Sequence, residues 1–334
     1  MAKLTTPVPI PEYPFGIHHR QQLLSMGSCF AEHVGAYLGA RKFQQLLNPF
    51  GIIYHPLVLA KLLQQTIDNE LPQEQDLFEE QGLWRHYDFH SRYAHHQRDH
   101  ALASLHNQYE RTAEWLKELD TLILTFGTAY GYCLKASGEW VNNCHKQPGA
   151  LFDKSLASVE TMHTAVGQVL KRLKTINPDL QVILTISPVR HLRDGLLENQ
   201  RSKARLLLTQ ESLCEELDFV HYFPAYEILL DELRDYRYYT NDLLHPSSLA
   251  IEIITERFGK AFFSAETAVL SNDIYRLVQA SDHRPLHPDS DAAASFRKQT
   301  IAKMEVLMAK YDWLDFADER TRLLRPIDPS LPGS

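Results

Sequence analysis

The chain has 334 residues, of which 44% are hydrophobic and 23% charged, a composition typical of a globular protein with a large core. Its formal net charge of −8 argues against binding of nucleic acid or of an anionic membrane surface as its main role. The sequence shows no apolar run long enough for a transmembrane helix and no apolar segment typical of a signal peptide. The four cysteines lack CxxC spacing, so we expect reduced thiols in a soluble, cytoplasmic protein.

The chain begins with an arm of about twenty residues that is punctuated by prolines and is expected to be extended. Short apolar runs then predict buried strands over residues 22–26, 43–47, 121–127, 181–186 and 218–223. Apolar residues spaced three or four apart predict helices over residues 29–39, 57–67, 99–119, 158–175, 198–217 and 248–263. The stretch from residue 128 to residue 146 is expected to be a loop.

This alternation of strands and helices indicates an α/β fold whose parallel sheet is covered on both faces. Residues 1–263 would form this domain, and residues 264–334 a helical extension packed on it. The segment 55–120 is longer than a simple crossover needs, which favours an inserted cap beside the site. In such sheets the functional groups lie at the carboxyl ends of the strands.

The first candidate residue is Ser28, which follows the first strand and precedes the first helix in the run Gly27-Ser28-Cys29-Phe30-Ala31. A serine at a helix N-terminus is commonly an N-cap. The same position also suits chemistry, because free N–H groups and the helix dipole favour negative charge there. Ser28 alone therefore leaves capping and catalysis both open.

Asp242 and His245 lie three residues apart just before the helix predicted at 248–263. A serine hydroxyl becomes a good nucleophile when a histidine takes its proton and a carboxylate orients that histidine. Local hydrogen bonds in a loop are the alternative explanation of the Asp-x-x-His spacing.

Five histidines between residues 86 and 100 invite a metal site, since His86 and His90 have i,i+4 spacing. The segment lacks a clear helical period, an HExxH motif and cysteine partners, so no metal and no cofactor are expected. Its aromatic residues are instead expected to pack as a lid or cap.

The sequence resembles the SGNH (GDSL-like) hydrolase superfamily and, within it, the GSCFA family named for the run at residues 27–31. Further landmarks follow in the expected order over residues 23–260: Asn48-Pro49-Phe50-Gly51, Thr125-Phe126-Gly127-Thr128-Ala129, Asn143-Cys144-His145-Lys146, Ser187-Pro188-Val189-Arg190-His191, Asn199-Gln200-x-Ser202-Lys203, Phe223-Pro224-Ala225-Tyr226-Glu227 and Asp242-x-x-His245-Pro246-Ser247. The resemblance implies a three-layer α/β/α sandwich with a flavodoxin-like, five-stranded parallel sheet.

The resemblance also assigns roles to residues. Ser28 matches the block I nucleophile, although the usual Gly-Asp-Ser is replaced by Gly-Ser after Met26. Asp242 and His245 match the block V Asp-x-x-His. The N–H groups of Ser28 and Gly51, the block II glycine, are expected to bind the oxyanion.

Block III normally reads Gly-x-Asn, but here Gly127 is followed by Thr128 and Ala129, so one oxyanion donor is missing. Loss of such a donor typically costs about two to three orders of magnitude in rate. Thr128, Asn143 or His145 could replace it, and Asn143 is our preferred candidate.

Two further residues remain open from the sequence. Cys29 is a rival nucleophile at the helix N-terminus, although a cysteine packed under the sheet is the preferred interpretation. Arg190 follows a central strand and could pair either with a substrate carboxylate or with a structural acid, Asp242 or Asp235.

These features predict a metal-independent esterase that removes an acyl group, for example acetyl, from a carbohydrate or small metabolite. Superfamily analogy alone suggests the substrate. An O-acyltransferase that uses the same triad and a catalytically degenerate module that binds a glycan or protein are the alternatives. The oligomeric state and the natural substrate do not follow from the sequence.

Overall fold

The computed structural model describes residues 5–325. Residues 1–4 of the predicted arm and residues 326–334 of the predicted helical extension lie outside it. The helices are α1 Cys29–Gly39, α2 Pro56–Asp68, α3 Arg98–Lys117, α4 Val159–Ile176, α5 Leu196–Glu216, α6 Ala225–Glu227, α7 Ser248–Phe262, α8 Ala265–Asp282, α9 Asp291–Lys310 and α10 Ala317–Leu324. The strands are β1 Leu23–Gly27, β2 Gln45–Leu47, β3 Phe78–Glu80, β4 Leu83–Arg85, β5 Thr121–Phe126, β6 Tyr130–Leu134, β7 Trp140–Val141, β8 Phe152–Leu156, β9 Gln181–Ile186 and β10 Val220–Phe223.

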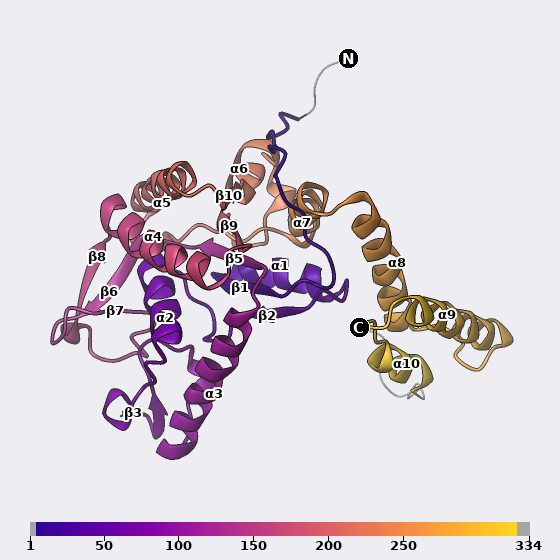
Figure 1. The fold of residues 1–334 in the computed structure, drawn as a ribbon, viewed down its shortest axis with the longest axis horizontal. Helices are drawn as coiled ribbons and strands as arrows, with labels where there is room; N and C mark the ends of the chain where they lie inside the picture. The colour runs from indigo at the N-terminus through magenta and orange to yellow at the C-terminus, as the bar shows by residue number, and fades with distance from the viewer. Residues whose placement is uncertain (1–4, 326–334) are drawn as a thin grey trace.

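Five parallel strands form the central sheet in the order β10-β9-β5-β1-β2 (Figure 1). This is the strand order of flavodoxin-like doubly wound sheets, and the order reverses between β1 and β5. The predicted α/β class and five-stranded parallel sheet are therefore confirmed. The carboxyl ends of β1 and β5 carry Gly27 and Gly127, so the expected position of a site coincides with the nucleophile turn.

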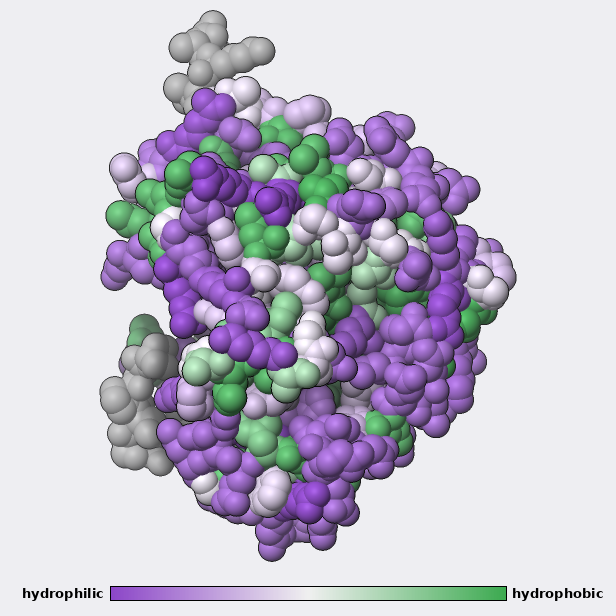
Figure 2. All heavy atoms as spheres, turned by 90° about the vertical axis from the view of Figure 1, so that its left-hand side faces the viewer, coloured by the Kyte–Doolittle hydropathy of each residue, from purple (hydrophilic) through white to green (hydrophobic). Residues whose placement is uncertain are grey.

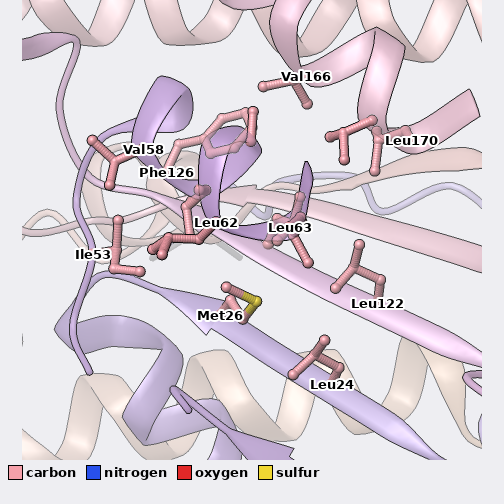
Figure 3. Packing of buried hydrophobic residues seen from close by; sticks show 14 of the residues in the cluster. Leu24, Met26, Ile53, Val58, Leu62, Leu63, Leu122, Phe126, Val166 and Leu170 are labelled. Carbon is pink, nitrogen blue, oxygen red and sulfur yellow. The ribbon is translucent and has the colours of Figure 1, made fainter. Parts of the chain in front are cut away.

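Successive side chains of each strand point to opposite faces, and both faces are covered by helices. Leu24 and Leu122 belong to a core that includes α2, α4 and α5. Figure 3 shows this packing, with Leu63 and Leu170 above the two strands. Leu23 and Ile123 belong to a second core on the other face, under α1 and α7. The three layers thus follow from strands that are apolar on both sides.

The segment predicted as an insertion over residues 55–120 divides into two parts. Helix α2 lies in the main core, so it is a layer of the sandwich and not a cap. Residues 69–97 leave the sandwich and contain the hairpin β3–β4. This hairpin segment, residues 69–97, contacts the turn at residues 48–51 through two hydrogen bonds. His90 N–H donates to Phe50 O at 3.2 Å, and the Arg92 guanidinium donates to Asn48 O at 2.6 Å.

The stretch after β5 is a three-stranded antiparallel sheet, β7-β6-β8, where the sequence predicts a loop. It lies at the left of Figure 1. Figure 2 faces this side and shows hydrophilic and hydrophobic residues interspersed over the surface. The strands escape detection because they are mostly half-buried and lack a continuous apolar run.

Helices α8, α9 and α10 form a smaller lobe with its own apolar core, set to the side of the sandwich in Figure 1. The lobe meets the sandwich near α1, where His19 stacks on Trp313 with ring centroids 4.8 Å apart. Lys42 and Glu319 form an ion pair at 2.8 Å across the same boundary. A loop over residues 283–290 separates α8 from α9.

The proline-rich arm packs along α7 as an extended segment. Ile17 N–H donates to Phe262 O at 2.7 Å, and Tyr13 stacks on the Phe262 ring at 4.4 Å. No helix within residues 5–325 is long and apolar enough to cross a membrane.

Candidate active site

Ser28 is the N-cap of α1, as the sequence suggests. Its Oγ accepts a hydrogen bond from Phe30 N–H at 3.3 Å, and the residue is fully buried. Gly27 before it has a φ of 144°, and a Cβ there would lie 2.2 Å from Thr125 O, so only glycine fits this turn. The Ser28 N–H donates to Thr125 O at 3.1 Å, so in this structure it is not free to bind an oxyanion, contrary to expectation.

Asp242 and His245 form a pair: His245 Nδ1 and Asp242 Oδ2 lie 2.6 Å apart. The other carboxylate oxygen, Oδ1, accepts from the Thr240 hydroxyl and from the N–H groups of Leu244 and His245. The His245 N–H and then the Thr240 hydroxyl are the largest causes that hold the pKa of Asp242 well below its usual range. The carboxylate thus stays ionised and directs Nδ1–H toward itself, leaving Nε2 as the basic end of the ring.

The serine and the Asp–His pair lie at the same end of the sheet without touching. The charge of His245 adds to burial in lowering the pKa of His33 on α1, where Glu32 opposes it. It also contributes to lowering the pKa of His191 after β9, so His245 lies beside both elements. Its side chain is 52% exposed, whereas Ser28 is buried, and no hydrogen bond within residues 5–325 joins them.

The predicted glycine donors are engaged elsewhere. Gly51 N–H donates to Asn48 O at 2.8 Å inside its own turn. The N–H groups of Gly127 and Thr128 both donate to Tyr54 O, at 2.8 and 3.1 Å. These residues border the site, but their backbone donors point into the protein.

Thr128, Asn143 and His145 also make other contacts. The Thr128 hydroxyl lies 2.9 Å from Ser202 Oγ. Asn143 and His145 are tied to the hairpin segment, since Asn143 N–H donates to Tyr87 O and His145 Nε2 lies 2.9 Å from His86 O. Burial is the main cause of a lowered pKa for His145. The choice of Asn143 as replacement oxyanion donor therefore finds no support in its contacts.

Asn48 is a residue that sequence reasoning passed over. It is 1% exposed, and its Oδ1 accepts from Gly27 N–H at 2.9 Å. Because Oδ1 is the acceptor, Nδ2 is identified as the donor end, and it is buried with no partner among residues 5–325. An unsatisfied amide is costly to bury, so this one is an available donor beside the nucleophile turn.

Lys203 is a second functional candidate, to which the sequence assigns a place in a family landmark but no role. The side chain is 1% exposed, and Nζ donates to Gly127 O and Ser187 O, each at 2.7 Å. These carbonyls end β5 and β9, so the lysine holds together two loops that border the site. Burial is the largest cause that lowers its pKa to about 7; nearby Arg190 lowers it further, while Cys29 opposes the change.

Cys29 is half-buried and lies beside Lys203 and Tyr54. Burial raises the pKa of its thiol, and Glu32 raises it further, with Lys203 opposing. A raised pKa disfavours the thiolate that a cysteine nucleophile requires. All four cysteines are free thiols.

Arg190 lies at the carboxyl end of β9, as the sequence predicts for the mouth of the site. Its guanidinium carbon lies 5.6 Å from the centroid of the Tyr239 ring. Neither acid proposed as its structural partner is bonded to it: Asp242 holds His245, and Asp235 pairs with Arg237 at 2.8 Å.

The histidine-rich segment makes local contacts. His86 Nδ1 accepts from Asp88 N–H at 3.1 Å, and His90 Nδ1 accepts from Arg92 N–H at 3.3 Å. Within the described part of the chain, no three His, Cys, Asp or Glu side chains are grouped so that they could hold a metal ion.

Two family models match the sequence in succession. The model described as the GSCFA family covers residues 22–258, which contain Ser28, Lys203 and the Asp242–His245 pair. The chain belongs to the GSCFA family. The model described as "GSCFA domain protein, C-terminal domain" covers residues 274–328 and therefore includes most of the helical lobe.

A search of curated proteins finds no match to this GSCFA chain. Among solved structures, an acetyl xylan esterase (Est2A) from the rumen bacterium Butyrivibrio proteoclasticus matches with a TM-score of 0.36 and 10% identity. The match covers 76% of this chain and 64% of the esterase. A superposition this loose supports no statement about activity.

Proposed function

We propose that the chain is a serine ester hydrolase in which Ser28 is the nucleophile, His245 the general base and Asp242 its orienting carboxylate. The observation that carries the proposal is the 2.6 Å contact between His245 Nδ1 and Asp242 Oδ2, with Oδ1 of the same carboxylate held by three donors. Such a carboxylate fixes the imidazole in the tautomer that leaves Nε2 free to accept a proton.

In the proposed reaction, His245 Nε2 takes the Ser28 proton while Oγ attacks the ester carbonyl carbon. The tetrahedral intermediate collapses, the ester C–O bond breaks, and the alcohol leaves with the proton from His245. Water then attacks the acyl-serine, gives one proton to His245, and releases the acid as Ser28 recovers its proton.

The proposal requires Ser28 and His245 to approach each other when substrate binds. Ser28 is fully buried and its Oγ is used as a helix cap, while His245 is half-exposed. Catalytic hydrogen bonds are often long or absent before substrate binds and shorten only in the complex. The loop with Asp242 and His245 is therefore the element expected to close on α1.

We further propose Asn48 Nδ2 as the oxyanion donor in place of the missing block III asparagine. It is a buried donor with no partner in the described part of the chain, and its amide is held one residue from the nucleophile by the bond to Gly27. Asn48→Asp keeps an acceptor for Gly27 N–H but removes the donor, so kcat should fall by about 10²–10³. An unchanged kcat in a folded Asn48→Asp protein would remove Asn48 from the mechanism.

Acyl transfer to a hydroxyl is the second candidate function, and the complete burial of Ser28 favours it. A site that excludes water protects an acyl-enzyme until another acceptor arrives. By superfamily analogy, the acyl group would be an O-acyl group on a carbohydrate or small metabolite. Incubation of the enzyme with an ester substrate and a sugar alcohol distinguishes hydrolysis from acyl transfer, because hydrolysis yields the free acid and transfer yields an ester of the sugar alcohol.

Hydrolysis of 4-nitrophenyl acetate by the wild type and by Ser28→Ala tests the proposal. The variant should fall to background, a loss of about 10³-fold or more. Ser290→Ala is a matched control, because Ser290 also caps a helix, through Ala293 N–H at 3.2 Å, but lies in the C-terminal lobe. Equal rates for wild type and Ser28→Ala would exclude the serine mechanism and favour a binding module.

A fluorophosphonate probe tests the identity of the nucleophile. Mass spectrometry should find the adduct on Ser28, and an adduct on Cys29 would reassign the nucleophile.

A further inference from the structure

Arg190 carries a guanidinium without an acidic partner. The side chain is half-buried, and within residues 5–325 no ion pair or side-chain hydrogen bond includes it. Arg257, another partly buried arginine of the same domain, does have an acidic partner, because it forms an ion pair with Glu232 at 2.8 Å. Because no carboxylate of the described residues pairs with it, the Arg190 guanidinium is available to bind an anion through charge-assisted hydrogen bonds.

Its position places this cation beside the proposed catalytic loop. The Tyr239 ring that it covers belongs to a residue bridged to Pro246, which follows His245. On the other side, the charge of Arg190 acts on Lys203, which in turn lies beside Cys29 at the nucleophile turn. Arg190 thus lies between the two parts of the proposed site.

Three of the acids near this region are already engaged. Asp242 holds His245 and three further donors, and Asp235 pairs with Arg237. Glu227, near Tyr226, accepts from the Tyr222 hydroxyl at 2.8 Å. Among the described residues, Arg190 is thus a positive group at the mouth that no acid neutralises, in a chain whose net charge is −8.

We infer that Arg190 binds an anionic group of the substrate, a carboxylate or a phosphate, and so selects negatively charged esters. A planar guanidinium suits both anions, because its N–H groups can bond to two oxygens at once. The Tyr239 ring, whose centroid lies 5.6 Å from the guanidinium carbon, attracts the cation and lowers the side-chain entropy lost on binding. This inference rests on the proposed function, since it concerns the same site.

Binding to the Ser28→Ala protein tests the inference without requiring turnover. The probes are 4-acetoxybenzoate, 4-acetoxyphenyl phosphate and the neutral 4-acetoxybenzamide, each titrated calorimetrically. The anions should bind about 10- to 100-fold more tightly than the amide. Whichever anion binds more tightly identifies the preferred substrate class.

Adding Arg190→Gln to the Ser28→Ala protein should abolish the preference for anions. Adding Arg190→Lys instead should retain part of the preference, and this variant replaces Arg190→Gln in the test if Arg190→Gln does not fold. Arg276→Gln in the same background is the control, because Arg276 is exposed on α8, and it should keep the full preference. Equal affinity for anions and amide, or a preference that survives Arg190→Gln, overturns the inference.

Turnover of 4-acetoxybenzamide by the wild type tests the proposed function separately. If Ser28-dependent turnover is found and no anion preference exists, only the role of Arg190 fails. If the preference depends on Arg190 and no turnover occurs, only the hydrolase proposal fails.

Discussion

Replacement of Lys203 by methionine tests how the site end of the sheet is held together. The lysine is 1% exposed and donates to the carbonyl oxygens of Gly127 and Ser187. Its pKa falls from an ordinary value of 10.5 to about 7, mainly because burial disfavours the charged form. Such a shift predicts a measurable dependence of stability on pH.

The sign follows from proton binding. Between pH 7 and pH 10.5 the unfolded chain keeps the Lys203 proton while the folded protein releases it, so the unfolded state binds more protons. The free energy of unfolding of the wild type therefore gains about 1.4 kcal/mol per pH unit from this group. From pH 7 to pH 9 the gain is about 2.3 kcal/mol, because the folded group is half titrated at pH 7, and well below pH 7 the contribution is constant.

Urea unfolding of wild type and Lys203→Met at pH 6, 7, 8 and 9 measures this gain. The difference in free energy between the two proteins should be flat from pH 6 to 7 and then rise in favour of the wild type. Lys298→Met, at an exposed position on α9, is the control and should show no such rise. A difference that stays constant from pH 7 to pH 9 would show that Lys203 keeps an ordinary pKa, and the argument would be wrong.

Three further predictions concern single residues. Gly51→Ala should lower the free energy of unfolding by about 1–3 kcal/mol or more, because φ is +90° and the new Cβ would lie 2.2 Å from His90 Cβ. Thermal unfolding measures this loss. Gly149→Ala is the control and should be nearly neutral, because nothing lies within 4 Å of the new Cβ. Equal unfolding temperatures for the two variants would contradict the predicted clash at Gly51. Asp242→Asn should lower kcat for 4-nitrophenyl acetate by about 10³–10⁴ with the fold intact, because an amide holds the wrong tautomer of His245; a loss below tenfold would argue against the Asp–His pair as the base. Cys29→Ala should leave that rate within a few-fold, and iodoacetamide should modify Cys29 of the wild type more slowly at pH 7.5 than a free cysteine, since burial and then Glu32 raise the pKa of the thiol. Rapid alkylation of Cys29 would contradict this prediction.

The succession of strands and helices in the sandwich could be predicted from the sequence, because buried strands and amphipathic helices have distinct hydrophobic patterns. Helix α1 begins at Cys29 and strand β9 runs over Gln181–Ile186, both as predicted. The sheet β7-β6-β8 was missed because its half-buried strands carry no continuous apolar run. Residues 55–120 were assigned to one insertion, because their length could not reveal that α2 packs in the main core.

The predicted oxyanion donors show where motif position stops being informative. Ser28, Gly51 and Gly127 lie where the family pattern expects them, yet the N–H groups of Ser28 and Gly127 are bonded to carbonyls of other segments and that of Gly51 to a carbonyl of its own turn. Whether an N–H is free depends on which carbonyl the fold brings against it, and a motif does not contain that information.

The sequence by itself determined the α/β class, the turn that makes Ser28 a helix cap, and the pairing of Asp242 with His245. These are short-range consequences, because side chains three residues apart in one loop can meet without help from the rest of the fold. Only the tertiary structure decided that Ser28 is buried and that Lys203 is enclosed by two strand ends. It also decided that, among the residues the structure describes, the Asn48 amide nitrogen has no partner and Arg190 pairs with no acid. Burial and the pairing of long polar side chains depend on segments far apart in the chain, and only folding brings those segments together.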